Sequence, residues 1–190
     1  PFGITDKTLE GDSKTSGDIG LDVKYGVTPS MTLDLTYNTD FSQVEADEER
    51  VNLTRFPIFF PEKRDFFLEN ANIFTFGDIN KLDYRMAPNR YGREFFLFNS
   101  RNIGLENGNV IPIIGGGRLT GMIGDFEIGT LGMQTKGTET SDPTNFGLFR
   151  LRKKILERSN IGLIMANKSS SGLSFNQSYG VDANLQFFRY

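Results

Sequence analysis

The chain has 190 residues, with 21 Lys plus Arg against 24 Asp plus Glu, so its formal net charge is −3. That balance argues against nucleic acid as a partner, because nucleic-acid-binding domains carry a basic face. The sequence has no Cys and no His. This excludes disulfides, thiolate or imidazole metal sites, thiol nucleophiles and Ser-His-Asp triads.

Residues 1–19 are polar and rich in Gly, Ser, Thr and Asp, which predicts a loop. Residues 20–40 predict a β-hairpin. The run LDVKYG before Thr28-Pro29-Ser30 and the run MTLDLTYN after it both alternate apolar and polar residues with period 2. That period is typical of strands joined by a short connection.

Residues 41–93 lack this alternation and predict a long insert. The run VEADEER is acidic, and FPIFFPEKRDFFL places Phe on both sides of four charges. Pro61 suits the first position of a short helix ending near Asn70, where its missing N–H costs nothing. A connection of this length with so many Phe is expected to pack rather than stay in water. We therefore predict a packed, partly helical insert.

Residues 94–190 return to strand patterns, for about eight strands in the whole chain, arranged as an antiparallel meander. The later predicted strands are Phe95–Ile103, Gly117–Ile123, Phe126–Thr135, Phe146–Arg152, Ser159–Ala166 and Tyr179–Phe188. Gly124-Asp125 predicts a second hairpin turn, and the basic run 153–158 predicts the next connection. The fold class is therefore all-β, and 1–190 is expected to be one domain segment.

The chain opens on Pro1 and closes on FFRY, so we expect an interior piece of a longer polypeptide. No apolar run approaches the ~20 residues of a transmembrane helix. Alternation alone leaves two architectures open. The apolar face points to the core in a water-soluble sheet, and to lipid in an outer-membrane barrel whose polar face lines the lumen.

Few motifs point to chemistry. Gly115-Gly116-Gly117 precedes a strand rather than a helix, so a bend is expected in place of a phosphate loop. The acidic cluster within 45–49 lacks the spacing of a calcium loop. Pairs such as Glu62 with Glu69, or Asp65 with Glu69, could serve a glycoside hydrolase, but sequence selects none of them. We predict no catalytic residue, metal or cofactor.

The run Pro61–Asp65 is the most unusual feature, because four consecutive charges separate two Phe pairs. It is either a solvated turn or a segment folded into a polar cavity, where buried charges must be paired. The second interpretation predicts an ion-pair network and a set of aromatic anchors. The network comprises Glu62, Lys63, Arg64, Asp65 and Glu69, and the anchors are Phe59, Phe60, Phe66 and Phe67.

The stretch Leu21–Gly77, LDVKYGVTPSMTLDLTYNTDFSQVEADEERVNLTRFPIFFPEKRDFFLENANIFTFG, resembles a signature region of a poorly characterised bacterial family. Its members pair an N-terminal domain similar to family 9 carbohydrate-binding modules with a C-terminal outer-membrane β-barrel. The runs LFNSRNIG, IPIIGGGRLTG and YGVDANLQFF follow in the expected order. The resemblance implies the bacterial outer membrane and transfers no catalytic residues. It allows carbohydrate only through a domain absent here.

The sequence thus predicts a non-enzymatic segment of an outer-membrane β-barrel, with the 41–93 insert packed in its lumen. Expected partners are the lipid bilayer and other outer-membrane proteins in a complex, for a role in passage, docking or assembly. One alternative is a soluble β-sandwich that binds sugars, although such platforms favour Trp, which the chain lacks. A second alternative is a hydrolase that uses two carboxylates.

Overall fold

A computed structural model of the chain describes residues 2–7, 13–39, 62–77, 97–106, 109–139, 141–171 and 174–186. Its strands are β1 (Phe2–Lys7), β2 (Ser13–Asp18), β3 (Leu21–Thr28), β4 (Met31–Tyr37), β5 (Leu105–Glu106), β6 (Asn109–Val110), β7 (Ile113–Ile123), β8 (Phe126–Thr135), β9 (Thr144–Leu156), β10 (Ser159–Ser170) and β11 (Phe175–Asn184). Its helices are α1 (Asp65–Leu68) and the 3-10 turns η1 (Ala71–Phe74) and η2 (Ser100–Asn102).

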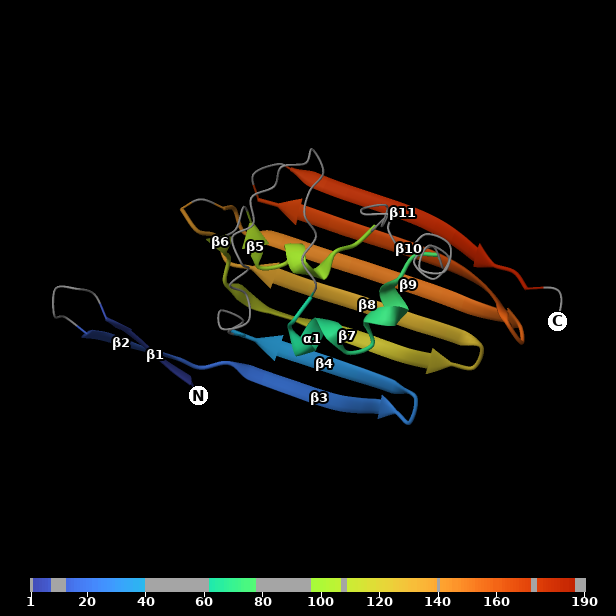
Figure 1. Ribbon diagram of the computed structural model, residues 1–190, viewed down its shortest axis with the longest axis horizontal. Helices are drawn as coiled ribbons and strands as arrows, with labels where there is room; N and C mark the ends of the chain where they lie inside the picture. Colours follow the sequence, from blue (N-terminus) through green and yellow to red (C-terminus); the bar gives the residue numbers. More distant parts are fainter. Residues whose placement is uncertain are drawn as a thin grey trace, which may run out of the picture.

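Seven strands form one antiparallel sheet in the order β11-β10-β9-β8-β7-β4-β3, seen from red to blue in Figure 1. Each strand pairs with its neighbour in the chain except at β4 and β7, which pair across the long connection 38–112. The pairs β1–β2 and β5–β6 form two further two-stranded sheets. The predicted all-β class and antiparallel meander are confirmed.

The predicted hairpins at 20–40 and at Gly124-Asp125 are confirmed by the β3–β4 and β7–β8 ladders. Gly124 has φ +57°, a conformation that glycine adopts without strain in a tight turn. The connection predicted at 153–158 is shorter in the structure than the sequence suggests. Strand β9 continues to Leu156, because charged side chains at a strand end leave the backbone ladder intact.

Two other segments also differ from the sequence prediction. Residues 1–19 contain the hairpin β1–β2 in place of the predicted loop. The prediction relied on apolar alternation, whereas ladder hydrogen bonds join backbone groups and do not require it. The described part of the predicted strand 95–103 contains no strand and includes the 3-10 turn η2 at Ser100–Asn102, where the Asn99 side chain accepts the N–H of Arg101 at 3.2 Å. Such side-chain bonds compete with strand pairing.

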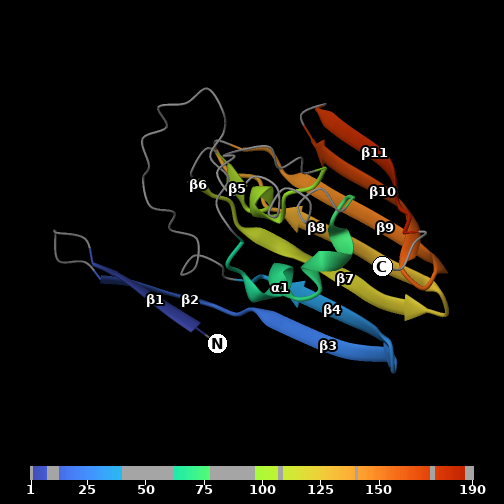
Figure 2. The same cartoon turned by 45° about the vertical axis from the view of Figure 1, so that its right-hand side comes forward.

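Residues 62–77 and 97–104, which we name the cover, lie over one face of the sheet (Figure 2). Helix α1 is shorter than the predicted helix and is followed by Asn70 in a left-handed conformation, with φ +55°. The hydrophobic core lies between the cover and the central strands. It consists of Phe67, Ile103, Ile113, Leu131, Met133, Leu148 and Ile164.

Candidate functional site

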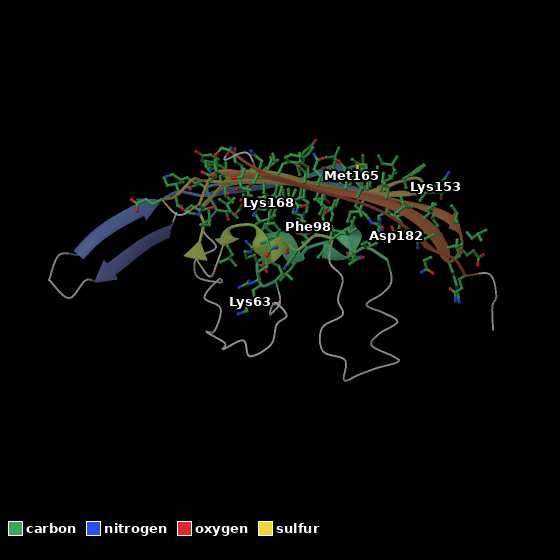
Figure 3. All side chains as sticks on the ribbon, turned by 90° about the horizontal axis from the view of Figure 1, so that it is seen from above. Lys63, Phe98, Lys153, Met165, Lys168 and Asp182 are labelled. Carbon is green, nitrogen blue, oxygen red and sulfur yellow. The ribbon has the colours of Figure 1, made fainter. Side chains whose placement is uncertain are left out.

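The strand register assigns every side chain of the sheet to one of two faces. One row of paired residues crosses all seven strands: Tyr25, Leu33, Leu119, Thr130, Phe149, Met165 and Tyr179. This row lies on the face away from the cover, which we name the outer face. The opposite face, which we name the covered face, carries the cover. Figure 3 shows Met165 and Lys153 on one side of the sheet and Phe98, Lys168 and Asp182 on the other.

Charge is divided sharply between the two faces. Of the eleven charged residues in the seven described strands, ten lie on the covered face by register. They are Asp22, Lys24, Asp34, Arg118, Glu127, Arg150, Arg152, Lys154, Lys168 and Asp182. The outer face carries Lys153, near the short turns, with its ammonium 5.2 Å from the ring centroid of Phe126.

The outer face is apolar and open to solvent. Several of its apolar side chains are exposed, with Tyr179 at 61% and Val181 at 69%. Others on this face are Tyr25, Phe149 and Met165. Isolated exposed apolar residues are ordinary, whereas a contiguous apolar surface marks contact with a partner or a membrane.

The covered face holds the cover through buried arginines, of which Arg118 on β7 is the centre. Its side chain is 1% exposed and bonds the Asp34 carboxylate from Nη2 at 2.7 Å and from Nε at 3.2 Å. Its Nη1 donates to the backbone carbonyls of Phe66 and Glu69 in the cover. The Glu69 carboxylate lies 3.6 Å away and also pairs with Lys24 on β3. One guanidinium therefore joins the two layers.

Arg64 organises the cover itself. Its guanidinium is buried and pairs with both carboxylate oxygens of Glu62 at 2.8 Å. It also donates to the carbonyls of Ile103 at 2.6 Å and Ser100 at 2.7 Å. Its Cζ lies 4.2 Å from the ring centroid of Phe67, a cation–π geometry. These bonds tie the 62–77 part of the cover to its 97–104 part.

A third arginine links distant strands. Arg150 on β9 pairs with Asp182 on β11 at 2.6 and 2.7 Å, across the intervening strand β10. The pair passes over Gly162, where a Cβ would lie 2.6 Å from both Arg150 and Asp182. Asp182 also accepts the backbone N–H of Gly77 at 2.9 Å, so the end of the 62–77 segment is held to β11.

The predicted network is assembled differently from its sequence order. Glu62 pairs with Arg64, whereas Glu69 pairs with Lys24 and Arg118 on the sheet. Lys63 and Asp65 lie exposed at the surface of the cover. Of the predicted anchors, Phe66 and Phe67 meet edge to face with centroids 5.2 Å apart, and Phe67 is buried. Phe59 and Phe60 lie outside the described residues.

Sequence reasoning missed the partners contributed by the sheet. These are Lys24, Asp34, Arg118, Arg150 and Asp182. Each is a charged residue in an alternating strand, which looks like an ordinary solvated position. The sequence did carry a sign of this arrangement. Within each strand these charged residues occupy the positions that alternation assigns to one face of the sheet.

Glu62 and Glu69, which the sequence offered as one possible acid pair, both have a lowered pKa. Burial raises the pKa of Glu62, but hydrogen bonds from Arg64 and Ser100 outweigh it and hold the pKa below its usual value of 4.5. A hydrogen bond from Lys24 likewise lowers the pKa of Glu69. A glycosidase acid needs a raised pKa.

The described ranges hold neither a metal site nor a membrane-spanning helix. No group of three or more His, Cys, Asp or Glu residues is placed there to hold a metal ion. None of the helices in that part of the chain is long and apolar enough to cross a membrane. The acidic cluster within 45–49, which the sequence analysis weighed as a calcium loop, lies outside the described residues.

Comparison with known proteins gives one match. A family described as a domain of unknown function (DUF5916) matches residues 2–81. That region includes strands β1 to β4 and the 62–77 segment of the cover. No curated protein matches the chain. No solved structure matches it either. The match agrees with the predicted resemblance to a family of unknown function.

Proposed function

We propose that this chain is a segment of a non-enzymatic β-barrel in a bacterial outer membrane. The outer face of the sheet meets lipid, and the covered face lines a lumen that the cover partly fills. The protein serves as a channel, docking or assembly component there. The observation that carries the proposal is the division of charge, with ten charged residues on the covered face and Lys153 on the other.

Strand length supports this assignment. Strands β7 to β11 have 10 to 13 residues each. Tilted strands of ~9–11 residues span the hydrocarbon core of a bilayer. Strands of ordinary globular proteins most often have ~5–6 residues. The central strands are therefore long enough to cross a membrane.

The connections support it as well. The turns at 29–30, 124–125 and 157–158 lie at one end of the sheet, whereas the connections 38–112 and 136–143, and the shorter one between β10 and β11, lie at the other. Barrels of outer membranes have short turns on the periplasmic side and longer loops outside. At the end with the short turns, Lys153 lies over the Phe126 ring. This suits a lysine at the membrane–water interface, with its apolar stem against the ring and its ammonium in water.

The position of the cover supports a partly filled lumen. A barrel interior is polar, and inserted loops or helices plug many barrels. The cover meets the sheet through Arg118, Lys24 and Asp182, all on the charged face. An insert held by such pairs needs a surface shielded from lipid, because unsatisfied polar groups are costly in hydrocarbon.

Single-cysteine labelling tests the proposal, because the chain has no Cys of its own. Val23→Cys and Asp22→Cys form a matched pair of exposed neighbours on opposite faces of β3. Met165→Cys adds the centre of the outer face. Each variant of the whole protein is labelled with an environment-sensitive fluorophore and reconstituted in phosphatidylcholine liposomes.

Labels at 23 and 165 are expected to be quenched by lipids that carry a nitroxide on the acyl chain, and to resist aqueous iodide. The label at 22 is expected to show the opposite behaviour. Equal iodide quenching at 165 and 22, in protein that stays soluble without detergent, would contradict the proposal and favour the soluble β-sandwich.

A further inference from the structure

The outer face of the sheet carries a cation at Lys153. This residue of β9 is exposed, and its ammonium stands 5.2 Å from the ring centroid of Phe126, its direct partner on β8. Figure 3 shows Lys153 on the same side of the sheet as Met165. The ten other charged residues of the seven described strands lie on the covered face. Within those strands, Lys153 is therefore a single charge in an apolar surface.

The neighbours of Lys153 on this face are apolar in every direction. The row of paired residues that contains it consists of Ile123, Phe126, Lys153, Ile161 and Ala183. Along β9, the nearest residues on the same face are Leu151 and Ile155. In the described part of the chain, the ammonium meets the Phe126 ring and no carboxylate. The described outer face thus supplies no anion to neutralise this charge.

A lysine without an anion is costly on a surface that meets lipid. An ionisable side chain at membrane depth pairs with an opposite charge or extends its apolar stem until the charge reaches the interface. The carboxylates of the described strands lie on the covered face, so the sheet itself separates them from Lys153. Lipid offers another source of negative charge, because anionic headgroups lie at the membrane surface.

The place of Lys153 along β9 suits contact with headgroups. It lies four residues from Phe149, which shares a row with Met165, and toward the turn at 157–158. At ~3.3 Å per residue this is about 13 Å along the strand, or about 9 Å of depth at a tilt of ~45°. Half of the hydrocarbon core is ~15 Å thick. The lysine stem can carry the ammonium over the remaining distance.

We propose that Lys153 binds the phosphate of an anionic phospholipid, in the leaflet at the end of the sheet with the short turns. The ammonium pairs with the phosphate, and the adjoining acyl chain lies against Phe126 and Ile161. A zwitterionic headgroup carries its own cation, which competes for the phosphate, so the site selects the anionic lipid. This selection rests on the proposed membrane role and adds the class of lipid to it.

Fluorescence quenching in liposomes tests the selection. Ile161→Cys places a label beside Lys153, because Ile161 is exposed and pairs directly with it on β10. The whole protein is reconstituted in phosphatidylcholine that contains a small, equal fraction of nitroxide-labelled phosphatidylglycerol or nitroxide-labelled phosphatidylcholine, with the nitroxide at one acyl position. Quenching by the phosphatidylglycerol is expected to be about two- to fivefold stronger, the scale of one lysine at an anionic surface.

Three further substitutions in the Ile161→Cys protein assign the effect to one ammonium. Lys153→Met should bring the quenching ratio of the two lipids close to one, and Lys153→Arg should preserve it. Lys154→Met is the matched control, because Lys154 is an exposed cation one residue along, on the covered face. It should leave the ratio unchanged. Circular dichroism spectra of each variant in the same liposomes show whether the sheet is retained.

Equal quenching by the two lipids in the Ile161→Cys protein would overturn the proposal and leave the membrane assignment intact. A ratio that persists in Lys153→Met, or that falls equally in Lys154→Met, would overturn it as well. Absence of quenching by both nitroxide lipids would overturn the membrane assignment and this selection together. Failure of the lipid selection and failure of the proposed function are therefore distinguishable.

Discussion

At the scale of single residues, Arg118 joins the sheet to the cover. It is buried on β7, pairs with Asp34 on β4 and donates to two carbonyls of the cover. A buried ion pair adds little net stability compared with apolar packing, but removing one partner leaves the other charge buried and uncompensated. Removal of the Arg118 side chain is therefore expected to lower the stability of the fold by more than the intact ion pair adds to it.

Arg118→Met is expected to lower the free energy of unfolding by about 3–5 kcal/mol, because the buried Asp34 carboxylate loses its partner. Denaturant unfolding followed by circular dichroism measures this. Arg158→Met, in the exposed 157–158 turn, is the control and should change the value by less than about 0.5 kcal/mol. Adding Asp34→Asn to Arg118→Met should recover part of the lost unfolding free energy. A double variant whose loss equals the sum of the two single-variant losses would contradict this coupling.

The attachment of the cover is also expected to depend on pH. The pKa of Glu62 lies below its usual 4.5 in the folded protein. A carboxyl with a lowered folded pKa stabilises above its unfolded pKa, and that contribution is lost as pH falls through the folded value. Hydrogen exchange of backbone amides in 62–77, corrected for intrinsic rates, should therefore accelerate below pH 4.5. Glu62→Gln should flatten this dependence, and an unchanged slope in that variant would refute the assignment.

At the scale of elements, the cover rests on strands that approach it closely. A Cβ at Gly129 on β8 would lie 2.7 Å from Ile73 and 2.8 Å from Phe74 of η1. On the same strand, a Cβ at Gly132 would meet nothing within 4 Å. The close packing of η1 on β8 thus requires glycine at position 129. No such contact requires glycine at position 132.

Gly129→Val is expected to displace η1 and cost about 1–3 kcal/mol, as overpacking does. Chymotrypsin should then cut near Phe66 and Phe67 several-fold faster than in the unsubstituted protein. Gly132→Val, with open space on the outer face, should leave the cutting rate unchanged. Equal rates for the two variants would contradict the contact between η1 and β8.

At the scale of the whole molecule, the sheet separates two environments. The covered face has a hydrophobic core and buried ion pairs, while the outer face presents an apolar band across seven strands. An open sheet with one such face is stable only if something covers that face. The proposal assigns lipid to it.

Met165→Arg should cost about 2–4 kcal/mol of folding stability in liposomes, the cost of a cation near the bilayer centre. Asn167→Arg, two residues along the same face of β10, should cost less than Met165→Arg, because the cost of a cation falls with distance from the bilayer centre. Folding titrations into liposomes measure both values. A smaller cost at 165 than at 167 would speak against lipid contact.

Much of the element pattern follows from local sequence. Side chains in a strand alternate between faces. The apolar and polar alternation in the sequence was therefore enough to predict the hairpins at 20–40 and around Gly124-Asp125. The polar strands β1 and β2 could not be recognised in this way, because their ladder joins backbone groups. The 3-10 turn at Ser100–Asn102 depends on a side-chain bond from Asn99, which competes with an apparently strand-like pattern.

The sequence by itself determined the all-β class, the meander and the common phase of the strand charges, because these depend on residues near one another in the chain. Only the tertiary structure decided which charges pair. Arg118 meets Asp34 at a separation of 84 residues and the carbonyl of Glu69 at a separation of 49. Those contacts depend on how the 38–112 connection returns over the sheet, and local periodicity carries no information about that path.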